Sequence, residues 1–139
     1  MIAGTGIDLV EVRRIDRLLQ KWGDRFTGRF FAPGEAAYCG AKARPAIHYA
    51  ARFAAKESFL KSLGIGLGMG VHLREIEVSR DRRGKPVLVL HGKAASMLRE
   101  RGITAVHLSL THTADHAAAV VILETEATRP TEKKSHVRE

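Results

Sequence analysis

The sequence is poor in cysteine, proline and aromatic residues, and each shortage argues against a class of protein. Among its 139 residues there are one cysteine, four prolines and 6% aromatic residues. The single Cys39 cannot form a disulfide within the chain, so a packed thiol is its simplest role. No apolar run reaches membrane-spanning length and no cleavable signal pattern is present, which predicts a cytoplasmic protein without a membrane partner.

Acidic residues are also scarce, because 15 Asp and Glu face 23 Lys and Arg and leave a net charge of +8. The excess lies in the body of the chain, where residues 11–61 hold eleven basic against five acidic residues. Apolar residues at helical spacing within residues 12–22 leave a basic face that carries Arg13, Arg14 and Arg17. Solvated faces usually interleave both charges, so this face suits an acidic partner; an ordinary solvated face is the alternative.

A nucleic-acid-binding module is the main competing function for so basic a chain. Phosphate contacts from Lys and Arg alone can give salt-sensitive binding without sequence preference. The chain lacks, however, an aromatic stacking pattern on a strand and any recognisable nucleic-acid-binding motif. We therefore expect no nucleic acid partner and keep this function as the alternative.

The hydrophobic patterns predict one small α+β domain over residues 1–124. Alternating or β-branched residues indicate strands, and apolar residues three or four positions apart indicate helices. The expected helices span about 12–23, a short segment beginning at Pro33, 45–63 and 93–101, and the expected strands span 2–9, 71–78, 87–90, 106–110 and 117–123. Residues 125–139, with their Pro, Thr, Lys and Glu, are expected to form a disordered C-terminal tail.

The helix expected at residues 45–63 is apolar nearly all round, yet it contains Glu57 and Lys61 one turn apart. A lone ionised carboxylate among apolar side chains is strongly disfavoured unless it has a partner, a set of hydrogen bonds or a metal ion. The simplest explanation is an ion pair between these two residues, in the favoured order of Glu before Lys. The alternative is that Glu57 binds a cation as part of a reactive site.

Asp8 is a second acid in an apolar run, between Ile7 and Leu9 of the first expected strand. Two carboxylates from separate elements, with no cysteine nearby, are what Mg²⁺ uses when substrate phosphates and water complete its coordination. We therefore interpret Asp8 and Glu57 as a magnesium site. The competing interpretation makes Asp8 the N-cap of the helix that follows.

Histidines and a glycine-rich loop give weaker signals. His107, His112 and His116 could hold zinc, but they fall on a strand and a turn, with no helix to bring spaced histidines together. A Ser109 nucleophile paired with His112 lacks the sharp G-x-S-x-G turn of hydrolases. The glycines of residues 64–70 could admit a phosphate just after the buried helix, or could simply form a flexible connection.

Five segments in order carry a family resemblance: GIDLVEV, RFFAPGE, ARFAAKESFLKSLG, IEV followed by GKPVLVL, and HLSLTHT. From about residue 2 to residue 123 the chain resembles the holo-acyl-carrier-protein synthase family of 4′-phosphopantetheinyl transferases. The departures are small: Ala51 stands where the family more often has Gly, and Ser-Leu-Thr-His-Thr replaces the commoner Ser-Ile-Ser-His-Ser. The resemblance implies an α+β fold in which a small antiparallel sheet wraps the long buried helix.

The resemblance also implies a reaction. It is the Mg²⁺-dependent transfer of 4′-phosphopantetheine from coenzyme A to a serine of an acidic apo-acyl carrier protein, with release of adenosine 3′,5′-bisphosphate. Asp8 and Glu57 would be metal ligands, and Lys61 would act on the leaving phosphate. The base that takes the serine proton stays open between Glu57 and a metal-bound water. A homotrimer with active sites between subunits is implied as well.

The two substrates receive residues by the same resemblance. The carrier protein would contact Arg13, Arg14 and Arg17 on the basic helix face. Arg52 and Lys56, which lie on another side of the buried helix, would reach a phosphate in a neighbouring subunit. The whole set expected to hold coenzyme A is Arg52, Lys56, Lys61, Gly64, Pro86, Ser109, Thr111 and His112.

Overall fold

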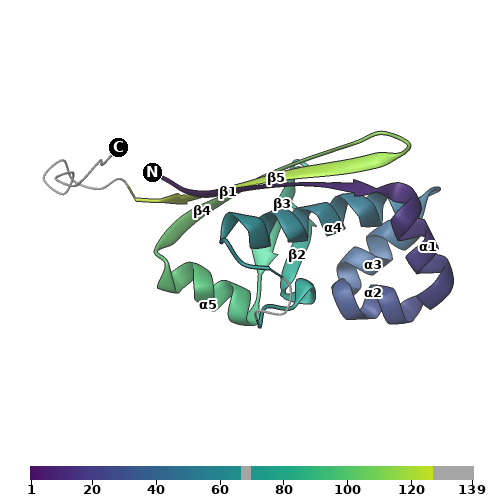
Figure 1. The fold of residues 1–139 in the computed structure, drawn as a ribbon, viewed down its shortest axis with the longest axis horizontal. Coiled ribbons are helices and arrows are strands. Elements are labelled where there is room, and N and C mark those ends of the chain that lie inside the picture. The colour runs from purple at the N-terminus through teal and green to yellow at the C-terminus, as the bar shows by residue number, and fades with distance from the viewer. Residues whose placement is uncertain (67–69, 127–139) are drawn as a thin grey trace, which may run out of the picture.

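A three-stranded antiparallel sheet in the order β1–β5–β4 packs one face against helix α4 (Figure 1). The strands are β1 (Ile2–Glu11), β4 (Ile103–His112) and β5 (His116–Thr125), and α4 spans Pro45–Ser62. The computed structural model describes residues 1–66 and 70–126. The α+β architecture, with its small sheet on a long buried helix, confirms the expected fold class.

Two glycines let β1 approach α4 closely. A β-carbon on Gly4 would overlap the carbonyl oxygen of Ser62, and one on Gly6 would overlap that of Ser58. The buried hydroxyl of Ser58 donates a hydrogen bond to the carbonyl oxygen of Ala119 on β5 (3.0 Å). This close packing places the inward side chains of β1 directly over the helix, and alternation along the strand makes Asp8 one of them.

Three helices precede α4: α1 (Val12–Trp22), α2 (Asp24–Phe30) and α3 (Pro33–Gly40). The first and third confirm the prediction, but α2 was not predicted. Its seven residues are too few to show helical periodicity, and Gly23, with a φ of 50°, has the features of a helix end. Helix α2 nevertheless packs on α4, because the rings of Phe30 and Phe53 meet edge to face.

A two-stranded sheet, β2 (Ile76–Arg80) and β3 (Pro86–Leu90), and helix α5 (Gly92–Glu100) complete the domain. The strand expected at 71–78 is wrong over its first half, where Leu73–Glu75 form a short 3₁₀ helix, η1. The cause is Glu75, whose carboxylate accepts hydrogen bonds from the backbone N–H groups of Lys93 (2.6 Å) and Ala94 (3.3 Å). It thereby caps α5 from a distant segment, which sequence spacing could not indicate.

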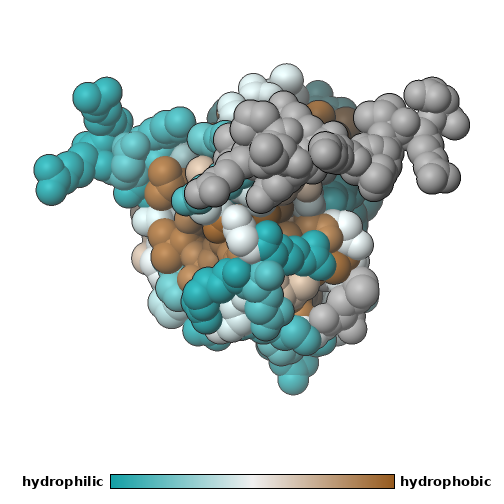
Figure 2. All heavy atoms as spheres, turned by 90° about the vertical axis from the view of Figure 1, so that its left-hand side faces the viewer, coloured by the Kyte–Doolittle hydropathy of each residue, from teal (hydrophilic) through white to brown (hydrophobic). Residues whose placement is uncertain are grey.

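The end of the molecule that carries α5 shows apolar surface in its centre, bordered by hydrophilic residues (Figure 2). In α5 and at the start of β4, Met97, Leu98 and Ile103 are only partly buried. No helix in the described ranges is long and apolar enough to cross a membrane.

Cys39 is packed in the core as expected, and β5 extends into the segment expected to be the tail. Cys39 is buried on α3, and burial raises the pKa of its thiol to about 11, which confirms a packed, unreactive role. Thr125, the first residue of the expected tail, still belongs to β5. Residues 127–139 lie outside the described residues, so the disordered tail stays a prediction.

Candidate functional site

Asp8 lies on the inward face of β1 and points toward α4. The Lys61 ammonium group of α4 donates hydrogen bonds to Asp8 Oδ1 (2.9 Å) and to the carbonyl oxygen of Ile7 (3.0 Å). The interpretation of Asp8 as a helix N-cap is wrong, because α1 begins after Glu11 and has no side-chain cap. We call Asp8, Glu57 and Lys61 the carboxylate site.

Glu57 lies one turn before Lys61 on α4 and is half-buried. Since Lys61 pairs with Asp8, the expected ion pair between Glu57 and Lys61 does not form, and Glu57 has no hydrogen bond to any residue that the structure describes. Burial raises the pKa of Glu57, the nearby Asp8 carboxylate raises it further, and Lys61 and Arg14 oppose the shift. A carboxylate in this position would be stabilised by a further cation.

The carboxylate site offers oxygen ligands from two residues only. Within residues 1–66 and 70–126, no group of three or more His, Cys, Asp or Glu side chains is placed to hold a metal ion. The zinc hypothesis is therefore wrong: His107 bonds to Glu124, and the ring of His112 lies beside that of His48, with 6.2 Å between centroids. Two carboxylates suit Mg²⁺, which takes its other ligands from phosphates and water.

A second group of side chains surrounds the ring of Tyr38 on α3. The Lys42 ammonium lies 4.4 Å from the ring centroid, and the guanidinium carbons of Arg52 and Arg80 lie 4.3 Å and 4.5 Å from it. Two histidine rings continue the group, with centroid separations of 6.0 Å and 6.2 Å. We call this set the Tyr38 cluster; its members are Tyr38, Lys42, His48, Arg52, Arg80 and His112.

Arg52 is the buried cation of the Tyr38 cluster, with only 4% of its surface exposed. Its guanidinium donates a long hydrogen bond to the carbonyl oxygen of His48 (3.5 Å), and its buried Nε has no hydrogen-bond partner in the part of the chain that the structure describes. Among the described residues, no Asp or Glu forms an ion pair with Lys42, Arg52 or Arg80. Buried charges are normally paired, so this cluster can accept an anion.

The carboxylate site and the Tyr38 cluster lie on different sides of α4. Arg52 and Glu57 are five residues apart, which rotates one side chain by roughly 140° from the other around the helix. The sheet shows the same division, because Asp8 belongs to the edge strand β1 and His112 to the opposite edge strand β4. One chain therefore presents the carboxylate site and the Tyr38 cluster in different directions.

Ser109 and Thr111 do not join His112 within one chain. Side chains alternate along β4, so His112 shares the inward face while Ser109 and Thr111 lie on the outward face of the sheet, which also carries the exposed side chains of β1 across the intervening strand β5. The pairing of Ser109 with His112 as a nucleophile and base is therefore wrong. A ligand could contact His112 together with Ser109 or Thr111 only if it reached both the inward and the outward face of a sheet.

The predicted role of Lys56 in binding a phosphate needs correction. Its side chain is fully buried, and its ammonium donates hydrogen bonds to Glu35 Oε1 (2.7 Å) and to the carbonyl oxygens of Leu73 (3.0 Å) and Ile76 (2.5 Å). All three N–H groups of the ammonium are used, so none is free for a phosphate. Lys56 instead ties α4 to α3 and to the segment η1–β2.

The other residues expected to hold coenzyme A lie at the ends of elements. Gly64 follows the end of α4 with a φ of 72°, and its N–H donates to the carbonyl oxygen of Lys61 (2.9 Å). Pro86 begins β3 and pairs with Arg80 of the Tyr38 cluster. Residues 67–69, the centre of the glycine-rich loop, lie outside the described residues, so the phosphate contact of that loop stays a prediction.

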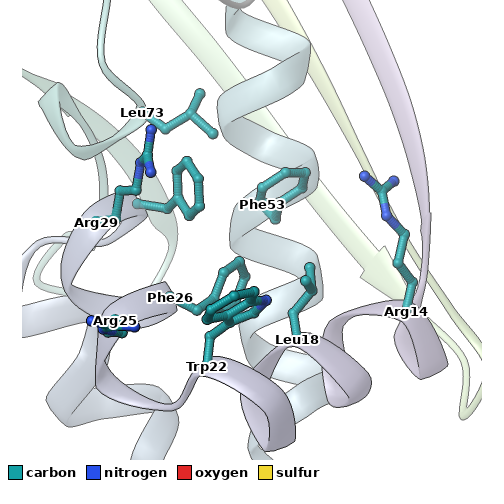
Figure 3. Close-up of a pocket in the computed structure, with 9 residues that line it drawn as sticks. Arg14, Leu18, Trp22, Arg25, Phe26, Arg29, Phe53 and Leu73 are labelled. Atoms are coloured by element: carbon teal, nitrogen blue, oxygen red, sulfur yellow. The ribbon is translucent and has the colours of Figure 1, made fainter.

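An apolar hollow of about 610 Å³ lies beside the basic helix α1, bounded also by α2 and α4 (Figure 3). Arg14 lines it, together with Arg25 and Arg29, which the sequence analysis missed because they belong to the unpredicted α2. Arg13 borders a different hollow, and Arg17 is exposed. The apolar lining consists of Leu18, Trp22, Phe26, Phe30, Phe53 and Leu73.

Known proteins are similar to this chain in both sequence and fold. The family model of the 4′-phosphopantetheinyl transferase superfamily matches residues 4–121. The holo-[acyl-carrier-protein] synthase of Syntrophus aciditrophicus (strain SB) is 59% identical over 124 residues, which cover 89% of this chain and 97% of that protein.

Two solved structures agree with the sequence match. The crystal structure of holo-[acyl-carrier-protein] synthase from Neisseria meningitidis has a TM-score of 0.81 at 40% identity and covers 90% of this chain and 100% of that chain. The Bacillus anthracis enzyme, in complex with CoA (3′,5′-ADP), has a TM-score of 0.74 at 38% identity, covering 91% of this chain and 99% of that chain. The family resemblance is thus confirmed, and the chain belongs to the 4′-phosphopantetheinyl transferase superfamily as an enzyme of the holo-[acyl-carrier-protein] synthase type.

Proposed function

We propose that the enzyme transfers 4′-phosphopantetheine from coenzyme A to a serine of an apo-acyl carrier protein. The serine oxygen bonds to the phosphorus nearer the pantetheine as the bond from that phosphorus to the bridging oxygen breaks. The serine gives up its proton to a base, either Glu57 or a water molecule at the site, and adenosine 3′,5′-bisphosphate leaves. The observation that carries the proposal is the carboxylate site, where Glu57 lies beside Asp8 and Lys61 and has no hydrogen-bond partner among the described residues. The complex of the Bacillus anthracis relative with CoA supports the choice of donor.

The carboxylate site fits a magnesium ion. Asp8 and Glu57 supply carboxylate oxygens, and the half-buried Glu57, with its raised pKa, is the group that a dication would stabilise. When bound, Mg²⁺ offsets the charge of the pyrophosphate and orients it for attack. Lys61 is 53% exposed, so it can turn from Asp8 to donate to the phosphate that leaves with the adenosine.

The Tyr38 cluster fits the other phosphate charge of coenzyme A. Arg52 and His112, both expected from the sequence to hold this substrate, lie in it together with Lys42 and Arg80. A polyanion would supply the counter-charge that no described Asp or Glu gives the buried guanidinium of Arg52. We assign to the Tyr38 cluster the phosphate groups of coenzyme A that do not lie at the carboxylate site.

A homotrimer would bring the carboxylate site of one chain to the Tyr38 cluster of the next. They lie at opposite edges of one sheet, and a cyclic assembly places one edge of each chain beside the other edge of the next. The outer face of the sheet is apolar on β1, where Ile7 is 68% and Leu9 is 66% exposed. Ser109 and Thr111 lie on that same face, so they would meet coenzyme A at a subunit boundary.

Leu9→Glu is expected to dissociate the oligomer and abolish transfer, because a carboxylate on the outer sheet face cannot be buried against a second chain. Size-exclusion chromatography with light scattering measures the mass, and the transfer assay measures the rate. Val89→Glu, at an exposed apolar position of β3 in the two-stranded sheet, should change neither. A fully active monomer of either protein would contradict the shared site.

The acidic carrier protein is expected to dock over the apolar hollow beside α1. The hollow combines apolar depth with arginines at its edges, which matches an acidic helix that has one apolar side chain at its centre. Arg14 also acts electrostatically on Glu57, so this surface adjoins the carboxylate site and leads a docked serine toward it.

Arg25→Ala should raise the KM for the carrier protein by about five- to tenfold and leave the KM for coenzyme A unchanged, because the variant removes a charge at the rim of the docking surface. Arg14→Ala should lower kcat as well, since Arg14 also faces Glu57. Arg99→Ala, an exposed arginine on α5, is the matched control and should change nothing. Equal loss toward both substrates in Arg25→Ala would rule out a docking role.

The reaction itself is tested by the intact mass of an apo-acyl carrier protein incubated with the enzyme, coenzyme A and Mg²⁺. The carrier is expected to gain one 4′-phosphopantetheine group, and EDTA should prevent the gain. An unchanged mass with several carrier proteins and a folded enzyme would refute the proposed function. A gain that EDTA does not affect would keep the transfer and remove the magnesium site.

A further inference from the structure

Three cations meet at one aromatic ring in the Tyr38 cluster. We propose that Tyr38 is a positioning residue for coenzyme A: its ring holds Lys42, Arg52 and Arg80 at one place without a carboxylate, so that the phosphates find the charges already assembled. This inference rests on the proposed function, because it assigns a role within the same substrate site.

The geometry shows how one ring can hold three cations. Each charge lies within 4.5 Å of the Tyr38 centroid, inside the range in which a cation is attracted to the electron-rich face of an aromatic ring. The Arg80 guanidinium also donates a hydrogen bond to the Tyr38 hydroxyl. Tyr38 thus contacts Arg80 twice, through its ring and through its oxygen.

The three cations come from separate elements. Lys42 follows α3, Arg52 belongs to α4 and Arg80 ends β2, so no helical or strand repeat fixes their spacing. Because all three lie near the same centroid, any two of them are within roughly 9 Å of each other and repel. Without the ring, repulsion would move the exposed side chains of Lys42 and Arg80 away from the buried Arg52, and a ligand would have to gather them again.

In the described part of the chain, no acidic side chain pairs with these three cations to hold them together. The ion pairs there involve other cations, and the buried Nε of Arg52 has no partner. The pKa of His48 is lowered by burial and by the charges of Arg52 and Lys42, which is consistent with an excess of positive charge. A carboxylate would hold the cations equally well but would compete with the phosphates; a neutral ring does not.

The test compares Tyr38→Leu with Tyr38→Phe. The leucine variant loses the ring and the hydroxyl, whereas the phenylalanine variant keeps the ring and loses only the hydrogen bond to Arg80. We expect Tyr38→Leu to raise the KM for coenzyme A at least tenfold, with kcat and the KM for the carrier protein within twofold of wild type. Tyr38→Phe should restore the KM for coenzyme A to within about threefold.

Calorimetric titration of coenzyme A into wild type and both variants distinguishes a failure of the proposed function from a failure of the positioning role. Wild-type protein that does not bind coenzyme A would refute the proposed function and this inference with it. Binding to wild type and to Tyr38→Leu with equal affinity would refute the positioning role alone. A Tyr38→Leu variant that lowers kcat and weakens both substrates equally would also overturn it, because that result marks a general structural defect.

Discussion

Glu57→Gln is expected to abolish metal-dependent transfer and to stabilise the metal-free protein at neutral pH. The variant removes an ionised ligand while keeping the shape of the side chain, and losing a metal's contribution of several kcal/mol lowers the rate by roughly 10²–10³-fold or more. Stability should change in the opposite direction, because the Glu57 carboxylate is half-buried near Asp8 and has no hydrogen bond among the described residues.

The sign of the stability change follows from the raised pKa of Glu57. A carboxyl group whose pKa is higher in the folded than in the unfolded chain favours folding below the unfolded value, and that contribution is lost as pH rises through the folded value. Glutamine does not ionise, so the gain from Glu57→Gln should be present at pH 8 and absent near pH 4.

Thermal unfolding in EDTA at pH 8 and pH 4 measures this gain, and the carrier-mass assay measures transfer. Glu100→Gln, on the exposed end of α5, is the matched control and should alter neither. Added Mg²⁺ should raise the melting temperature of wild type but not of Glu57→Gln. An active Glu57→Gln variant would remove Glu57 from the site.

The carboxylate site could be predicted because its residues violate local rules. Asp8 in an apolar strand and Glu57 in an apolar helix are each unfavourable unless something compensates, and that conflict is visible without coordinates. The partner of Lys61 was not visible. Helical spacing favours Glu57, whereas the close approach of β1 that Gly4 and Gly6 permit brings Asp8 to it.

The proposed docking surface and the Tyr38 cluster depend on contacts between distant segments. Arg25 was missed because a seven-residue helix leaves little periodic signal. Tyr38 and Arg80 are 42 positions apart and come from a helix and a strand, so nothing in their spacing joins them. The sequence places Arg52 on the side of α4 away from Glu57, but only the fold shows what it meets there.

Lys56 shows the opposite error: it was expected to bind a ligand phosphate, but its ammonium is buried and pairs within the protein. Its neighbours Arg52 and Glu57 both belong to sites, yet Lys56 faces the core and pairs with Glu35, a residue 21 positions earlier. Glu35 also accepts hydrogen bonds from the backbone N–H groups of Ala32 (2.8 Å) and Val78 (3.0 Å). This pair therefore joins α3, α4 and β2 at one point.

Lys56→Met is expected to destabilise the enzyme by about 3–5 kcal/mol, the usual cost of removing one partner of a buried ion pair. The change leaves the Glu35 carboxylate buried without its cation and removes the donor that serves the carbonyl oxygens of Leu73 and Ile76. Urea denaturation measures the free energy of unfolding. Burial lowers the pKa of Lys56 while Glu35 opposes the shift, so the ammonium depends on that carboxylate to stay charged.

Two further variants test whether the loss of stability is specific to the buried ion pair. Lys61→Met removes a lysine from the same helix, but the Lys61 side chain is 53% exposed, so the free energy of unfolding should fall by much less, about 1 kcal/mol. Glu35→Gln combined with Lys56→Met should recover part of the loss, because no uncompensated charge then stays buried. A single Lys56→Met variant as stable as Lys61→Met would show that the pair does not hold α3, α4 and β2 together.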